Sequence, residues 1–205
     1  MSLRRKRVPL NEKQTNKKGF TLIELLLALS FGSFIILSSA KIYPHFRYQT
    51  KFLQESFRLD QAMRQIMFSI EKDLRRAGFC NGKCLGMILR IGQYPGEMKN
   101  SCIILSYDLN KNGKLEGEQH RESEYFGYRL RKSVLEIQRG QLHCSGHGWE
   151  KISDPQEIKI THFSITQLPK SRLGTLFKTD FFANNHTKKP PIQREINSVI
   201  NNKNL

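Results

Sequence analysis

Cysteine supplies the most reactive side chains of this 205-residue chain. The four cysteines are Cys80, Cys84, Cys102 and Cys144. As thiolates, Cys80, Cys84 and Cys144 could bind zinc with His143 or His147, but their spacing is loose for such a site. In an oxidising compartment disulfides are favoured, and four cysteines allow three pairings. We favour Cys80–Cys84 as a local loop and Cys102–Cys144 as a link between strands.

Oxygen-bearing side chains alternate in the segment that begins at Asp108. Asp108, Asn110 and Asn112 are followed by Gly113 at the sixth position, as in the first half of an EF-hand calcium loop. The twelfth position is Gln119 instead of the expected bidentate glutamate, and no flanking helices are indicated. An Asx- and Gly-rich turn between strands explains the same residues. We expect no metal, and keep Asp108, Asn110 and Asn112 as a weak calcium candidate.

No pattern in the chain indicates catalysis. The six histidines do not combine into a Ser/His/Asp or metalloprotease arrangement. The glycine-rich segment from Cys144 to Trp149 lacks the strand-to-helix context of a phosphate-binding loop. We therefore expect no catalytic residues, no cofactor and no enzymatic activity.

A single carboxylate interrupts the long apolar run of residues 20–40. As a helix this run would span roughly 31 Å, which is the thickness of a bilayer core. Lys17 and Lys18 precede it, so the N-terminal flank should stay cytoplasmic. The carboxylate belongs to Glu24, and a charge inside such a span costs about 2.5–3.5 kcal/mol.

Three interpretations of the run compete. A secretory signal would be cut near Ala40 and would release a soluble binding domain. A plain membrane anchor would stay intact. In the third, the cut falls between Gly19 and Phe20, and the new amine of Phe20 lies four residues from Glu24. A neighbouring helix could then place its amine against this carboxylate, which neutralises both charges and fixes the axial register. Glu24 favours this last interpretation.

These residues carry a resemblance to a known family. The sequence Lys-Lys-Gly-Phe-Thr-Leu-Ile-Glu, ahead of an apolar helix, resembles the class III signal of type IV prepilins and type II secretion pseudopilins. The resemblance implies that a prepilin peptidase cuts after Gly19 and methylates Phe20, and that Glu24 guides subunit assembly. Short motifs between Asp73 and Lys151 resemble minor prepilins of the group called prepilin peptidase-dependent protein B, which are similar to J-type pseudopilins.

The resemblance implies a non-enzymatic minor pilin that helps to initiate or cap a type IV pilus. It would cross the inner membrane once, with a cytoplasmic N-terminus and a periplasmic domain, before it joins the filament tip. Expected partners are prepilin peptidase, the other minor pilins, the major pilin and the inner-membrane assembly platform. A secretion pseudopilin of the J type and a DNA-capturing competence pilin remain alternatives.

The elements that must position these residues follow from hydrophobic periodicity. Apolar residues recur at helical spacing from Phe52 to Ala77, and Pro44 should kink the helix or interrupt it briefly. Alternating patterns after Gly78 predict strands, with a hairpin across Lys132 and Ser133. We therefore expect an α+β, pilin-like fold in which a long helix packs on an antiparallel sheet. The expected segments are a leader (1–19), a transmembrane helix (20–43), an amphipathic helix (44–78), a β domain (79–182) and a disordered basic tail (183–205).

The charge of the chain leaves one further partner open. The formal net charge is +16, and residues 166–205 hold seven Lys or Arg against Asp180 and Glu195. Such an excess attracts DNA without sequence preference, so DNA binding is possible. A solvated basic tail explains the same charge, and no helix-turn-helix pattern is present.

Overall fold

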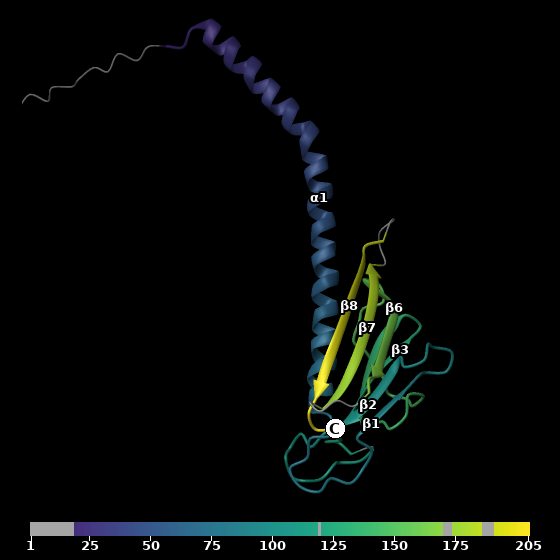
Figure 1. The fold of residues 1–205 in the computed structure, drawn as a ribbon. Coiled ribbons are helices and arrows are strands. Elements are labelled where there is room, and N and C mark those ends of the chain that lie inside the picture. Colours follow the sequence, from purple (N-terminus) through teal and green to yellow (C-terminus); the bar gives the residue numbers. More distant parts are fainter. Residues whose placement is uncertain (1–18, 119, 170–173, 186–190) are drawn as a thin grey trace, which may run out of the picture. The chain divides into compact units, whose positions relative to one another are not determined.

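The computed structural model describes residues 19–118, 120–169, 174–185 and 191–205. They form one helix and two antiparallel sheets (Figure 1). Residues up to Thr50 belong to one compact unit, and Lys51–Leu205 form a second. The elements are α1 (Leu22–Arg76), β1 (Leu89–Gly92), β2 (Cys102–Ser106), β3 (Tyr125–Arg131), β4 (Val134–Arg139), β5 (Glu150–Lys151), β6 (Ile158–Gln167), β7 (Thr175–Asn185) and β8 (Gln193–Asn202). The predicted α+β fold class is confirmed.

Helix α1 runs through Pro44 without a break. Of the two expected effects of Pro44, the interruption is therefore wrong, and the kink stays a prediction. Proline removes one N–H from the helical hydrogen bonds and its ring crowds the carbonyl four residues earlier, yet the helix continues on both sides of it. Leader residues 1–18 lie outside the described part of the chain.

The C-terminal half of α1 packs on the β domain through the predicted apolar face. Its buried residues include Leu59, Met63, Ile66, Ile70 and Leu74, all at most 4% exposed. Phe52, the first residue of the predicted stripe, is 38% exposed and does not belong to this core.

A buried carboxylate also attaches α1 to the sheet. Asp73 accepts hydrogen bonds from the hydroxyl groups of Tyr107 (3.0 Å) and Tyr128 (2.6 Å). Burial, together with the Asp73 charge, raises the pKa of Tyr107 to about 12 and raises that of Tyr128 as well. Both tyrosines therefore stay protonated at neutral pH and donate to Asp73.

The first sheet has the strand order β1-β2-β3-β4-β5. Its β3–β4 hairpin turns at Lys132 and Ser133, whose φ angles of 49° and 63° match a two-residue primed turn. The predicted hairpin is confirmed. The second sheet has the order β6-β7-β8, and its strand β6 meets the first sheet through the N–H of Ile160, which donates to Ser133 O at 2.9 Å.

The expected disordered tail is instead part of the second sheet. β7 extends to Asn185, β8 spans Gln193–Asn202, and the two strands pair in antiparallel register. The prediction of a mobile tail from residue 183 is therefore wrong for the described residues, where an alternating apolar pattern is interspersed with asparagines. Ile192 and Ile200 are buried, while Val199 is exposed. Lys188, Lys189 and Pro190 lie outside the described residues.

Asn202 at the end of β8 caps the C-terminal end of α1. Its side-chain amide donates to the carbonyl oxygens of Leu74 (2.6 Å) and Ala77 (2.8 Å). Its Oδ1 accepts the backbone N–H groups of Asn204 (2.7 Å) and Leu205 (3.1 Å). The last carbonyls of a helix have no partner within the helix, and here a strand 125 or more positions away in sequence supplies one.

We predict that Asn202→Ala lowers the free energy of unfolding by about 2–3 kcal/mol, because buried polar groups lose their partners. Thermal unfolding of the detergent-solubilised chain, followed by circular dichroism, measures this. Asn201→Ala is the matched control, since Asn201 Oδ1 has no hydrogen-bond partner among the described residues. Equal losses in the two variants would contradict the capping role.

Candidate processing and assembly site

The predicted cleavage point lies just ahead of α1. Gly19 and Phe20 are outside the helix, which begins at Leu22, and Phe20 is 89% exposed. The peptide bond between them is therefore in exposed, non-helical chain. A peptidase can bind such a bond without unwinding a helix.

Glu24 and Thr21 form a reciprocal cap at the start of α1. The Glu24 carboxylate accepts the backbone N–H (2.9 Å) and the hydroxyl (3.0 Å) of Thr21, and the Thr21 hydroxyl accepts the N–H of Glu24 at 3.3 Å. This is a capping box, in which two orphan N–H donors of the first helical turn are satisfied. Sequence reasoning missed this role, although the Thr-x-x-Glu spacing is visible in the sequence. Glu24 thus has a local structural role as well as the predicted one in assembly.

The first half of α1 presents its apolar side chains outward. Leu25, Leu29, Phe34 and Ile36 are each more than 55% exposed, and none of the apolar residues from Leu22 to Leu37 is buried. The apolar stretch is long enough to cross a membrane. A helix that is apolar on its exposed surface needs lipid or other helices around it, so it suggests membrane anchoring.

The four cysteines form two disulfides, Cys80–Cys84 and Cys102–Cys144. This is the pairing that the sequence favours. The first closes a short loop after α1, and the second ties β2 to the segment after β4. Zinc ligation by these residues is wrong for this state of the protein, because a sulfur bonded to sulfur is not a thiolate. His143 lies beside Arg90 instead, with 2.9 Å between Nδ1 and the guanidinium.

The calcium candidates Asp108, Asn110 and Asn112 brace the loop that follows β2. Asp108 is buried, and its carboxylate accepts the backbone N–H groups of Asn81 (2.9 Å), Asn112 (3.1 Å) and Gly113 (2.9 Å). Burial acts to raise the pKa of Asp108, but these backbone donors outweigh it and lower the pKa. The Asn110 Oδ1 accepts the N–H of Asn112 at 3.0 Å. These contacts agree with the interpretation as an Asx- and Gly-rich turn.

Sequence reasoning missed two further carboxylates of this loop, Glu116 and Glu124. The Glu124 Oε1 accepts the N–H groups of Leu109 (2.6 Å) and Asn110 (3.1 Å). Burial raises the pKa of Glu124, and the neighbouring charge of Glu116 adds to the increase. The fold of the loop brings the two glutamates together. Their spacing in the sequence follows no helical or strand period, so the sequence does not indicate that they are neighbours.

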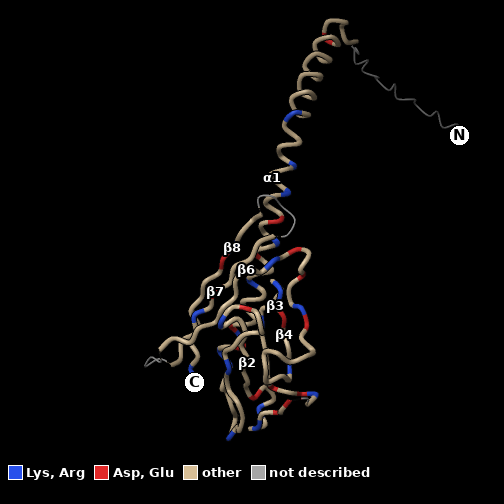
Figure 2. Tube along the Cα trace, turned by 90° about the vertical axis from the view of Figure 1, so that its right-hand side faces the viewer, with Lys and Arg blue, Asp and Glu red and all other residues tan. Residues whose placement is uncertain are grey.

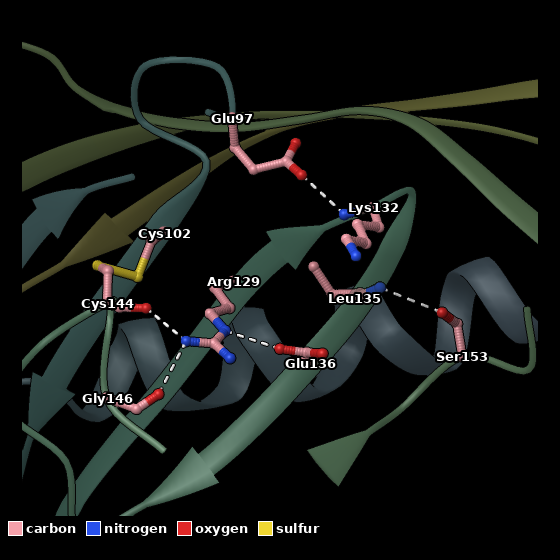
Figure 3. Close-up of polar contacts among 9 residues, drawn as sticks. All are labelled: Glu97, Cys102, Arg129, Lys132, Leu135, Glu136, Cys144, Gly146 and Ser153. Atoms are coloured by element: carbon pink, nitrogen blue, oxygen red, sulfur yellow. Dashed lines mark hydrogen bonds and ion pairs between the residues drawn. A yellow bond between two sulfur atoms is a disulfide. The ribbon is translucent and has the colours of Figure 1, made fainter. Parts of the chain in front are cut away.

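Arg129 on β3 forms a buried polar cluster in the β domain (Figure 3). It is 2% exposed, and its Nε pairs with Glu136 Oε2 at 2.7 Å. Its Nη1 donates to the carbonyl oxygens of Cys144 (2.6 Å) and Gly146 (3.1 Å). The guanidinium also lies 4.3 Å from the ring centre of Trp149. Arg129 therefore fixes the glycine-rich segment around Cys144 to the sheet.

In the described part of residues 166–205, two of the three basic side chains form ion pairs, and Lys203 is exposed without one. Lys178 pairs with Asp180 at 3.1 Å, and Arg194 pairs with Asp60 at 3.3 Å. Lys170, Arg172, Lys188 and Lys189 lie outside the described residues. Figure 2 shows Lys and Arg mixed with Asp and Glu over the β domain.

A long N-terminal helix with an apolar first half, packed on antiparallel β-sheets, is a pilin-like α+β arrangement, and the apolar half suggests membrane anchoring. A family model described as prepilin peptidase-dependent protein B matches residues 52–202. The chain is 34% identical over 152 residues to Prepilin peptidase-dependent protein B of Escherichia coli (strain K12), an alignment that covers 74% of this chain and 78% of the relative. The chain belongs to the prepilin peptidase-dependent protein B family. No solved structure gave a significant match.

Proposed function

We propose that this protein is a minor pilin that is processed by prepilin peptidase and helps to initiate or cap a type IV pilus. The observation that carries the proposal is the start of α1. An exposed Gly19–Phe20 bond precedes an outward-facing apolar helix with a carboxylate, Glu24, in its first turn. The name of the relative, which refers to dependence on prepilin peptidase, supports it.

The proposed sequence of events begins in the inner membrane, which the chain crosses once with its leader in the cytoplasm. The peptidase cleaves after Gly19 and methylates the new amine of Phe20. The apolar helix then packs beside those of other minor pilins and the major pilin at the assembly platform. Glu24 neutralises an amine there, and the periplasmic β domain selects neighbours. None of these steps requires catalysis by this chain, so we propose a non-enzymatic role.

A J-type pseudopilin of type II secretion would use the same N-terminal chemistry. DNA capture by a competence pilin is the next alternative, but the ion pairs of Lys178 and Arg194 leave it little support in the described region. A secreted domain cut near Ala40 would require cleavage within α1, since residues 22–76 are continuously helical. The helix continuity and the ion pairs favour an assembly subunit over a secreted domain or a DNA-capturing pilin, and we propose the pilus rather than the secretion pseudopilus as its assembly.

The N-terminus of the membrane-extracted protein tests the proposal. We expect intact mass and N-terminal sequencing to give methylated Phe20 when the peptidase is present and an uncleaved leader when it is absent. Gly19→Asp should block this processing, whereas Ala40→Asp, which would block a cut near residue 40, should leave it unchanged. A soluble product that starts near Lys41 would contradict the proposal.

A further inference from the structure

The C-terminal half of α1 carries two phenylalanines on the side that faces away from its buried stripe. Phe57 is 70% exposed and Phe68 is 69% exposed, whereas Met63 and Ile70 between and beside them are fully buried. Phe68 follows Phe57 by eleven positions, so the two rings lie on one face of the helix, roughly 16 Å apart along its axis. Leu53, also exposed, precedes them at helical spacing. Large apolar side chains that gather on one exposed face mark a contact surface.

The two rings border a shallow hollow in this face of α1. The residues that line it between the rings are Asp60, Gln61, Arg64 and Gln65. Asp60 is already paired with Arg194, whereas Arg64 forms no ion pair with a described residue. Lys72 continues the same face one helical turn beyond Phe68. We call this surface the outer stripe, and define it as Leu53, Phe57, Gln61, Arg64, Phe68 and Lys72.

The charges of this half of α1 are divided between its two sides. Its three half-buried carboxylates each contact the second sheet, through the pairs Glu55–Asn185, Asp60–Arg194 and Glu71–Ser198. The fourth carboxylate, Asp73, is buried. All exposed charged residues of the range 51–76 are basic, and they are Lys51, Arg58, Arg64, Lys72, Arg75 and Arg76. The outer side is therefore apolar and positively charged, without an exposed carboxylate.

This combination of charge and apolar surface selects among possible occupants. A second copy of the chain fits poorly, because two basic faces repel one another. Double-stranded DNA would neutralise the basic residues through its phosphates, but its backbone offers no apolar surface to the two rings. A helix that carries apolar and acidic residues on one face satisfies both requirements. Its apolar side chains cover Phe57 and Phe68, and its carboxylates lie against Arg64 and Lys72.

We propose that the outer stripe of α1 docks an acidic amphipathic helix of a different polypeptide, another subunit of the same assembly. The inference rests on the proposed function in taking the partner to be an assembly subunit. It adds that this partner is selected by charge and is not a second copy of this chain. The two phenylalanines supply the apolar contact, and the basic residues around them determine which partner is accepted.

Photocross-linking of the full chain in cells that assemble the filament tests the surface. The photoreactive residue p-benzoylphenylalanine replaces Gln61, which lies between the two rings and leaves both in place. The matched control replaces Gln167, an exposed glutamine on β6. We expect position 61, and not position 167, to yield an adduct with a different subunit, and mass spectrometry should place the link in a helical peptide rich in Asp and Glu. An adduct with a second copy, an adduct with nucleic acid, or no adduct at position 61 would overturn the proposal.

Charge variants in the same cells show whether complementarity determines the contact. Arg64→Glu and Phe68→Ala should each reduce the adduct at least about tenfold, as central contact residues of an interface do. Arg64→Lys, which keeps the charge, should retain it. Lys203→Glu makes the same reversal at an exposed position elsewhere and should leave the adduct unchanged. An adduct that persists at wild-type yield in Arg64→Glu would also contradict the proposal.

Two further measurements on these variants separate the possible causes of a lost adduct. Near-ultraviolet circular dichroism of each purified variant should match the wild type, because Arg64 and Phe68 are exposed and support no part of the core. The N-terminal residue of the same preparations reports on processing. A missing adduct from a chain that starts at methylated Phe20 would overturn only this inference, whereas an uncleaved chain in the presence of the peptidase would contradict the proposed function itself.

Discussion

Glu24→Ala should abolish incorporation of this protein into filaments while the β domain keeps its stability. Without the carboxylate, the Phe20 amine of a neighbouring subunit would be buried and unpaired, which costs on the order of 3–5 kcal/mol. That corresponds to at least a roughly hundredfold weaker association. Immunodetection of the subunit in sheared filaments measures incorporation, and near-ultraviolet circular dichroism reports on the domain.

The capping box offers a matched pair of controls for this prediction. Glu24→Gln keeps the hydrogen bond to Thr21, since Gln also serves at this position of a capping box, but it removes the charge. Thr21→Ala removes the hydroxyl part of the cap and leaves the charge. We expect Glu24→Gln to fail in assembly as Glu24→Ala does, and Thr21→Ala to assemble. Normal filaments from Glu24→Gln would show that the carboxylate acts only as a helix cap.

Arg129→Ala should lower the free energy of unfolding by about 3–5 kcal/mol, because it leaves the Glu136 carboxylate buried and unpaired. The substitution also removes the donor to the Cys144 and Gly146 carbonyls and the contact with Trp149. Thermal and urea unfolding of the oxidised chain in detergent measure the loss. Since a typical domain is stable by only about 5–15 kcal/mol, this variant should be close to unfolding at 37 °C.

Two further variants identify the cause of this loss. Arg90→Ala removes an exposed arginine that donates to Leu142 O at 3.2 Å, and should cost no more than about 0.5 kcal/mol. The double variant Arg129→Met with Glu136→Leu removes both charges, and replacement of a buried ion pair by apolar residues is often nearly neutral. We expect it to recover most of the loss. A double variant as unstable as Arg129→Ala would show that packing, and not the unpaired charge, dominates.

The features that depend on neighbouring positions could be predicted from the sequence. The apolar length of α1 and its buried face from Leu59 to Leu74 rest on spacings of a few residues. The β3–β4 hairpin depends on a two-residue turn at Lys132 and Ser133. The period of a helix or a strand decides which side chains share a face, so the helix and the hairpin could be predicted without a structure.

The secondary structure and burial of the polar segments could not be predicted from spacings between neighbouring residues. Residues 193–202 have the composition of a solvated tail, and they form a strand because β7 pairs with them and the end of α1 lies within reach of Asn202. Arg129 and Glu124 look like ordinary surface charges, and their burial depends on strands and loops that are distant in sequence. The sequence by itself thus determined the apolar helix and the class of fold, and it predicts the processing junction. Only the tertiary structure decided which polar side chains are buried, because their partners come from elements that meet only when the chain folds.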